Sequence, residues 1–291
     1  MKAVPHCYPC ALRRALTTAS RVTSDAWLQQ KVIAEGMRAL ADAEPDQTPA
    51  ELISFLLGSV HRTLGVSDPW ESERRRWLDE MLSVRDALLE RLEESKRPLR
   101  RALLLSARAN VFDNEILSTQ AIREDLTHLG LRASDDADSD FAFDDFERFQ
   151  SEISDARTLL VLHDSAPELP FDRVLFERIL AEHPGIEITS VVRRAPLLLD
   201  AVVDDAHVAG IDQLASRVVG LELPGNVGTG EGMRDLLPLV DAADVVLVKG
   251  QGHHQTMAGA GLSCYSLMRV KCPVMASAQA CRIGALLLVR S

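Results

Sequence analysis

The chain has 291 residues, of which 46% are hydrophobic and 26% charged, and its formal net charge is −11. This length can bury a large core in one or two domains. The acidic balance excludes a general nucleic-acid binder, because phosphate backbones are bound by clustered Lys and Arg. No apolar run approaches the roughly 20 residues of a membrane span, and the first residues lack a signal-peptide core, so we expect a cytoplasmic protein.

Residues 1–98 are predicted to form a helical N-terminal region. Thr48-Pro49-Ala50-Glu51 is a capping box with proline at the first helical position. Ser67-Asp68-Pro69-Trp70 predicts another helix start, and that helix should end before Pro98. Acidic residues surround the cluster at 74–76, which favours a solvated, salt-bridged helix face over an anion site.

Five cysteines, an odd number in a chain this long, do not indicate a secreted disulfide framework. Cys264, Cys272 and Cys281 lie in apolar sequence and are expected to be buried. Cys7-Tyr8-Pro9-Cys10 leaves three interpretations open. The two thiols are simply packed, or they form a redox pair, or they bind a structural metal with a third thiolate such as Cys272.

Residues 99–291 are predicted to form an α/β domain. From Arg157 onward, apolar strand candidates alternate with helices, and the candidates span 158–163, 186–192, 217–221, 244–248 and 284–289. Such alternation is typical of a largely parallel, Rossmann-like sheet with flanking helices. The acidic stretch 135–140 lacks the glycine and terminal glutamate of an EF-hand loop, so we expect a surface loop.

Acidic residues follow two of these strand candidates. The first runs into Asp164-Ser165-Ala166-Pro167-Glu168, with residues 171–180 as the following helix. The second, 186–192, precedes Asp200. Because the carboxyl ends of parallel strands meet at one edge of a sheet, we expect these carboxylates to lie close together.

Two carboxylates such as Asp164 and Asp200 repel each other at a sheet edge unless a divalent cation lies between them. Hard oxygen ligands favour magnesium or manganese. A third apolar run, Leu103 to Ser106, precedes Asn110 and Asp113 and is expected to bring these two side chains to the same rim.

The segment Lys249-Gly250-Gln251-Gly252-His253 follows the apolar run 245–248. A strand leading into Gly-x-Gly lets backbone N–H groups and one ammonium converge on an anion, and phosphate is the expected one. A glycine-flanked surface turn with a solvated lysine is the alternative. If His163, His253 or His254 were a ligand, the metal preference would move toward manganese, iron, cobalt or zinc. A strand-end histidine such as His163 can equally be a hydrogen-bonded core or rim residue.

Taken in order, these segments resemble the metal-dependent damage-control phosphatases, a family long catalogued as a domain of unknown function and also linked to protein-carboxylate methylation. The resemblance spans almost the whole chain and depends on motif order and spacing: Cys7-x-x-Cys10, Asn110-Val-Phe-Asp113, Asp164-Ser-Ala-Pro-Glu168 with Asp172, Asp200-Ala201 with Asp205-Ala206, Lys249-Gly-Gln-Gly252, and Lys271-Cys272-Pro273. The first and last motifs resemble the prokaryotic branch.

The resemblance implies a helical N-terminal region packed on the α/β domain, and a small phosphorylated metabolite as substrate. The implied metal ligands are Asp164, Ser165 and Asp200. The implied catalytic residues are Asp164, Asp200, Lys249 and Glu168, and the implied substrate contacts are Asn110, Asp113, Lys249, Gly250, Gly252 and His253. A bound cation would polarise the phosphoryl group, Lys249 would neutralise the developing charge, and Glu168 would position substrate or water.

Several family positions are replaced. The family pattern Asp-Asn-x-Gly-Glu is Asp164-Ser-Ala-Pro-Glu168 here, Asn-Asp-Ala-Thr is Leu199-Asp-Ala-Val202, and the Asn and Glu of Lys-Gly-Gln-Gly-Asn-Tyr-Glu are His253 and Gln255. Three functions remain open. They are a phosphatase whose metal-dependent chemistry is altered, a methyl or other group transferase that uses Gly225 to Gly230 as a nucleoside-binding turn, and a catalytically silent binding protein.

Overall fold

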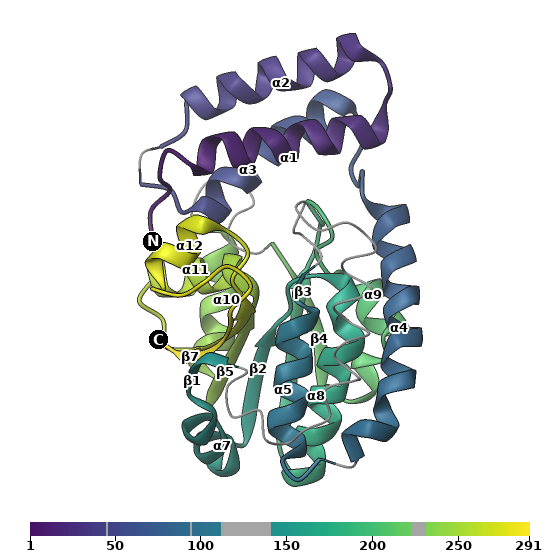
Figure 1. Cartoon of the computed structure of the whole chain (residues 1–291), viewed down its shortest axis with the longest axis vertical. Helices are drawn as coiled ribbons and strands as arrows, with labels where there is room; N and C mark the ends of the chain where they lie inside the picture. The colour runs from purple at the N-terminus through teal and green to yellow at the C-terminus, as the bar shows by residue number, and fades with distance from the viewer. Residues whose placement is uncertain (45, 94, 112–140, 223–230) are drawn as a thin grey trace.

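The computed structural model contains helices and one seven-stranded sheet. A layer of helices lies across one end of the α/β layer (Figure 1). The structure describes residues 1–291 except 45, 94, 112–140 and 223–230. Asp113, the acidic stretch 135–140 and the turn from Gly225 to Gly230 lie outside the described residues.

Three helices form the layer at the N-terminal end: α1 (Cys7–Val22), α2 (Ala26–Ala41) and α3 (Pro49–Leu64). Buried alanines on α1, including Ala11 and Ala15, pack with Leu52 and Leu56 of α3. The predicted capping box is confirmed, because the Glu51 N–H donates to Thr48 Oγ1 at 3.2 Å and the Thr48 N–H donates to the Glu51 carboxylate at 2.7 Å. These two bonds satisfy N–H groups that the first turn of α3 leaves without a helical partner.

Helix α4 (Glu71–Glu93) runs down the side of the α/β layer. The predicted solvated face is confirmed for Arg75 and Arg76, which form exposed ion pairs with glutamates of the same helix. It is wrong for Arg74, which is 4% exposed and pairs with Asp68 at 2.7 Å and Asp205 at 2.9 Å. A buried guanidinium needs such partners, because an unpaired charge inside a protein costs several kcal/mol.

The sheet contains β1 (Phe141–Asp144), β2 (Thr158–Leu162), β3 (Glu187–Arg193), β4 (Arg217–Leu221), β5 (Val245–Lys249), β6 (Tyr265–Arg269) and β7 (Leu286–Arg290). Its order is β1-β7-β6-β5-β2-β3-β4, and every pair is parallel except β6 with β7. The predicted α/β class with a largely parallel sheet is therefore confirmed. The sequence did not predict β1 and β6.

Helices cover both faces of the sheet. One face carries α5 (Pro98–Ala109), α7 (Phe146–Asp155) and α8 (Leu169–Glu182), and the other carries α10 (Glu231–Asp241), α11 (Gly250–Gly259) and α12 (Pro273–Ala278). Alternate residues of a strand point to opposite faces, so Leu159 and Val161 pack with the first group and Leu160 and Leu162 with the second. Within the described ranges, no helix combines the length and apolarity needed to cross a membrane.

The apolar run from Leu103 to Ser106 belongs to the helix α5 and is not a strand. Pro98 occupies the first turn of this helix, and the run is buried on all sides between α8 and the strands. The sequence of a helix that is buried on all sides is a continuous apolar run, and periodicity cannot distinguish such a run from a buried strand. Asn110 nevertheless reaches the sheet edge, as the residue after the last turn of α5.

Candidate active site

The polar residues of the candidate site gather where the strand order reverses. From the central strand β2 the chain continues to β3 and β4 on one side, while β5 lies on the other. Asp164 follows β2, Arg193 ends β3 and Lys249 ends β5. Open α/β sheets bind their ligands in the crevice at such a reversal, outside the carboxyl ends of the strands.

Backbone hydrogen bonds hold the Asp164 and Asp200 segments side by side. Ser165 and Asp200 form an antiparallel bridge, and the Ala201 N–H donates to the Asp164 carbonyl at 3.0 Å. The Ala166 N–H donates to the Leu199 carbonyl at 2.8 Å. The side chains of Asp164 and Asp200 stay accessible, with exposed fractions of 21% and 18%.

Each of these two carboxylates faces a cation that the sequence did not assign to the site. Lys271 Nζ lies 3.6 Å from Asp164 Oδ2, which also accepts from Asn110 Nδ2 at 2.8 Å. Arg193 Nε lies 3.1 Å from Asp200 Oδ1. The signal for Lys271 was present in the Lys-Cys-Pro motif, and the signal for Arg193 was its place at the end of a strand.

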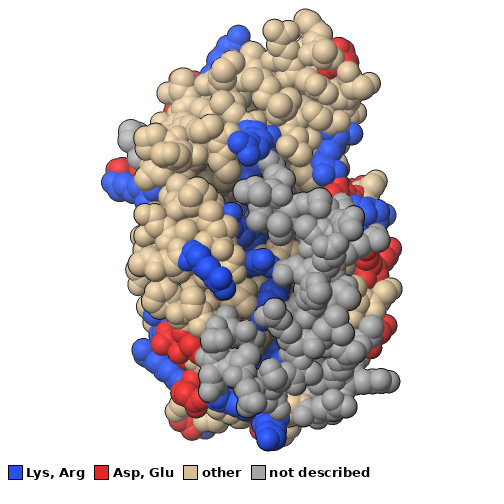
Figure 2. All heavy atoms as spheres, viewed as in Figure 1, with Lys and Arg blue, Asp and Glu red and all other residues tan. Residues whose placement is uncertain are grey.

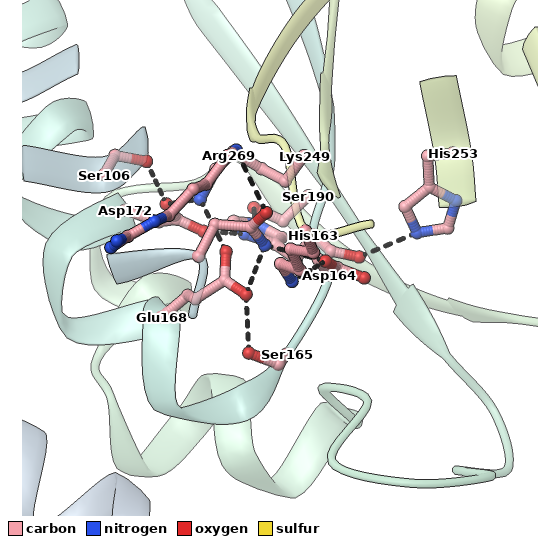
Figure 3. A network of polar contacts seen from close by, with 12 residues as sticks. Ser106, His163, Asp164, Ser165, Glu168, Asp172, Ser190, Lys249, His253 and Arg269 are labelled. Carbon is pink, nitrogen blue, oxygen red and sulfur yellow. Dashed lines mark hydrogen bonds and ion pairs between the residues drawn. The ribbon is translucent and has the colours of Figure 1, made fainter. Parts of the chain in front are cut away.

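Beneath this rim, Lys249 lies in a buried ionic network (Figure 3). Its ammonium lies 3.0 Å from Glu168 Oε2 and 2.6 Å from Asp172 Oδ1, and the lysine is 0% exposed. The alternative of a solvated lysine on a surface turn is therefore wrong. Asp172, a member of the resemblance motif, had no predicted role, yet it is the closer partner of the ammonium.

Further hydrogen bonds saturate the two carboxylates of this network. Glu168 accepts from Asn110 Nδ2 at 2.7 Å and from Ser165 Oγ at 2.6 Å. Asp172 accepts from Ser106 Oγ at 2.5 Å and pairs with His163 Nδ1 at 2.8 Å. Helices α5 and α8 and strands β2 and β5 thus all meet in one polar cluster.

Electrostatic pairing keeps Asp172 and Lys249 ionised at neutral pH. Burial raises the pKa of Asp172, but the neighbouring Lys249 and His163 outweigh it and hold that pKa well below its usual range. Burial lowers the pKa of Lys249, but Asp172 and Glu168 outweigh it and the pKa lies above its ordinary value. Asp172 and Lys249 therefore form a permanent ion pair and do not exchange protons near neutral pH.

The three histidines near the edge all form hydrogen bonds within the protein. His163 Nε2 contacts Ser190 Oγ at 3.2 Å, in addition to the Asp172 contact, so His163 is a fully paired core histidine. His253 Nε2 lies 3.0 Å from the His163 carbonyl oxygen, and burial together with Arg193 lowers the pKa of His253 to about 4. His254 contacts Ser266 and Gln279 through its two ring nitrogens.

Gly250 brings the backbone of α11 into direct contact with Asp164. Its φ is +79°, and a Cβ placed there would lie 2.0 Å from Asp164 Oδ2. Lys249 is the residue before α11, so Gly250 begins a helix rather than a loop, and the helix N-terminus lies at the sheet edge. The first N–H groups of a helix carry partial positive charge, which suits an anionic ligand next to the two carboxylates.

The donor set at this edge fits a hard cation with few protein ligands. Within the described residues, no three His, Cys, Asp or Glu side chains are arranged to hold a metal ion. Magnesium often binds one or two carboxylates and completes its octahedron with water and substrate phosphate oxygens. Asp164 and Asp200 each keep part of the carboxylate exposed and could supply such ligands.

The cysteines of the described chain are all free thiols. Cys264 is buried as predicted, whereas Cys272 and Cys281 are only half-buried. Cys7 is buried at the start of α1 and Cys10 is exposed. Burial raises the pKa of the Cys7 thiol, as do the nearby Cys272 and Cys10, which works against a reactive thiolate.

Comparison with known proteins decides the family. The model of the ARMT1-like damage-control phosphatase domain matches residues 3–287. The chain belongs to this family. A damage-control phosphatase of Archaeoglobus fulgidus is 26% identical over 283 residues, covering 95% of this chain and 94% of that protein. A damage-control phosphatase of Pyrococcus horikoshii is 24% identical over 300 residues, covering 100% of this chain and 99% of that protein.

A solved structure supports the same fold. The crystal structure of a DUF89 family protein from Pyrococcus horikoshii superposes with a TM-score of 0.84 at 22% identity, covering 100% of this chain and 99% of that chain. Membership of the damage-control phosphatase family supports a phosphatase-like role for this chain. Asp164, Glu168, Asp200 and Lys249 meet at or just below the sheet edge at the ends of β2, β3 and β5.

Proposed function

We propose that this protein is a divalent-metal-dependent phosphatase acting on a small phosphorylated metabolite, with magnesium or manganese as the metal. The observation that carries the proposal is that backbone hydrogen bonds hold the Asp164 and Asp200 segments side by side at the strand-order reversal. The hydrogen-bonded histidines argue against iron, cobalt or zinc held by imidazole. When bound, the cation supplies Lewis-acid polarisation of the phosphoryl group.

The chain's own residues bind and orient the phosphoryl group. The N-terminal N–H groups of α11 and the Lys271 ammonium offer positive charge beside Asp164. Arg193 and the N–H of Leu197, which donates to Asp200 Oδ2 at 2.8 Å, hold the second carboxylate in place. Hydrolysis joins a water oxygen to phosphorus, breaks the ester P–O bond and passes a water proton to the leaving oxygen.

Lys249 and Glu168 have a supporting part in this proposal. Both are 0% exposed and bonded to each other, so they contact the phosphoryl group only through their neighbours. Asn110 donates to both Asp164 and Glu168, and thereby couples the buried network to the rim. Preorganisation of this kind lowers the reorganisation needed in the transition state.

The test is phosphate release from a panel of sugar phosphates with magnesium, manganese or cobalt, alongside metal analysis after dialysis. Asp164→Asn and Asp200→Asn should each abolish stoichiometric metal and lower turnover by at least about 100-fold, the usual scale for loss of one electrostatic contact. Retention of full metal content by both variants would refute the assigned ligands. A parent protein without metal and without hydrolysis would instead support a silent binding protein.

A further inference from the structure

A cavity of about 390 Å³ lies between the helical layer and the α/β layer, next to the candidate active site. Residues of α1 and α3 form one wall, and α11 with the segment before α12 forms the other. The volume lies within the range of roughly 300–1,000 Å³ that is usual for small-molecule sites. This cavity is not needed to bind the phosphoryl group itself.

The charge of the cavity is opposite to that of the whole chain. Its described lining contains Arg13, Arg14 and Lys271 and no carboxylate, although the chain carries a net charge of −11. Figure 2 shows Lys and Arg gathered along the middle of one face, with the visible acidic side chains toward its margins. A larger cavity of about 730 Å³ between α4 and α9 (Val203–Val208) has more carboxylates than guanidinium groups in its described lining, so it suits an anion less well.

Lys271 connects the cavity to the catalytic carboxylates. It lines the cavity, and its Nζ lies 3.6 Å from Asp164 Oδ2. Its backbone N–H donates to Gln251 Oε1 at 3.2 Å, and Gln251 directly follows Gly250 at the start of α11. A ligand held at Asp164 through its phosphoryl group can therefore extend past Lys271 into the cavity.

Two glutamines in the cavity hold weak hydrogen bonds that a ligand oxygen could replace. Gln251 Nε2 reaches Cys272 Sγ and Gln255 Nε2 reaches Met275 Sδ, each at 3.8 Å. Sulfur is a weak acceptor, so an anionic oxygen would be the better partner for both amides. Gln255 also stands where the family pattern has glutamate, and this replacement leaves the cavity wall without a negative charge at that position.

We propose that the cavity binds a second anionic group of the substrate, a carboxylate or a further phosphate, while the phosphoryl group lies at Asp164 and Asp200. The inference rests on the proposed phosphatase function and narrows its substrate to small metabolites that carry a second anionic group besides the phosphoryl group. Arg13 and Arg14 hold the distal anion, and Lys271 lies between the two anionic ends. A neutral sugar with a single phosphate has no second anionic group to bind at Arg13 and Arg14.

Calorimetric binding to the full chain tests the proposal independently of turnover. The probes are glucose 1,6-bisphosphate and 6-phosphogluconate, compared with glucose 6-phosphate. At least one of the two probes with a second anionic group should bind about tenfold more tightly than glucose 6-phosphate, the scale of one charged hydrogen bond. The probe that is preferred tells whether the distal group is a phosphate or a carboxylate.

Three substitutions assign the effect to the cavity. Arg13→Gln and the nearly isosteric Gln255→Glu should each remove most of the preference for the probe with a second anionic group. Arg38→Gln is the matched control, because Arg38 is an exposed α2 residue outside the cavity and its loss changes the net charge equally. Thermal melting checks that each variant is folded.

Equal binding of the three probes, or a preference that survives both cavity variants, would overturn the proposal. Failure of the subsite and failure of the proposed phosphatase function give different results. Hydrolysis without an Arg13-dependent preference leaves a phosphatase without this subsite. An Arg13-dependent preference without hydrolysis under any metal supports the subsite and refutes the phosphatase.

Discussion

At the scale of single residues, the two glycines of the Lys-Gly-Gln-Gly segment have different physical roles. Gly250 has φ +79°, and a Cβ there would lie 2.0 Å from Asp164 Oδ2. A Cβ at Gly252 would meet only Ala50 Cβ, at the ordinary contact distance of 3.8 Å. Only the first glycine is therefore required by the contact with Asp164.

We expect Gly250→Ala to displace Asp164 and to lower both stability and phosphatase activity, with a stability cost of at least about 1 kcal/mol for the backbone strain alone. Gly252→Ala is the control, and it should leave activity within a few-fold because α11 accepts alanine there. Denaturant unfolding and phosphate release measure the two effects. Equal behaviour of the two variants would show that the close approach to Asp164 does not matter.

Lys249 offers a second prediction for single residues. Lys249→Met leaves Glu168 and Asp172 buried without their ammonium partner, and breaking a buried ion pair on one side costs about 3–5 kcal/mol. The exposed Lys31 provides the control, because Lys31→Met should change the free energy of unfolding by no more than about 0.5 kcal/mol. The free energies of unfolding of the two variants are measured by urea unfolding. A difference below about 1 kcal/mol between them would contradict a stabilising role for the ionic network.

At the scale of elements, the capping box fixes the start of α3 beside the cavity that Pro49 and Ile53 line. Thr48→Ala removes the hydroxyl that accepts the Glu51 N–H, and it should lower the free energy of unfolding by about 1 kcal/mol. Thr63→Ala in the same helix removes only a bond to the Ser59 carbonyl, and it should have a smaller effect. Comparison of the two midpoints of urea unfolding checks this ranking.

The strands that the sequence predicted are apolar-rich runs. Strands such as β2 and β5 are nearly continuous apolar runs bounded by polar residues, which is the pattern of a buried parallel strand. β1 has four residues with only Phe141 buried, and β6 mixes Tyr, Ser and Arg with apolar residues, so neither gives that signal. β1 takes its place by pairing with β7, which lies far from it in the sequence, and β6 takes its place between β5 and β7.

The same contrast applies to the candidate site. Asp164 and Asp200 could be predicted because they follow strands that must end at one edge. The burial of Lys249 could not, because it depends on Asp172 coming from α8 and on Ser106 coming from α5, both long-range contacts. Lys271 was missed as the partner of Asp164 for the same reason. Arg193 and Asp200 lie close in the sequence, and their pairing depends on the turn that folds the Asp200 segment back against the end of β3.

At the scale of the whole molecule, His253 makes stability depend on pH. Its folded pKa is about 4, below the ordinary 6.5, so only the unfolded chain binds its proton between these values. Lowering the pH from 6.5 to 4 therefore favours unfolding, by up to about 3 kcal/mol from this group. Above pH 6.5 the imidazole is neutral in both states and contributes nothing.

We expect His253→Asn to reduce the loss of stability between pH 6.5 and 4.5, whatever its baseline stability. His207→Asn, at an exposed histidine, should keep the slope of the parent protein. Urea unfolding with a metal chelator present measures the slope for all three proteins. An unchanged slope in His253→Asn would refute the assignment of this proton to His253.

The strand order also dictates when this protein can finish folding during its synthesis. β7 comes after all the other strands in the chain, yet it lies between β1 and β6 and bonds to both. β1 therefore remains without its partner until residues 286–290 have left the ribosome. Contacts of such large sequence separation fold slowly, and an unpaired strand is exposed to aggregation meanwhile. β1 thus depends on a strand that is synthesised much later to close its side of the sheet.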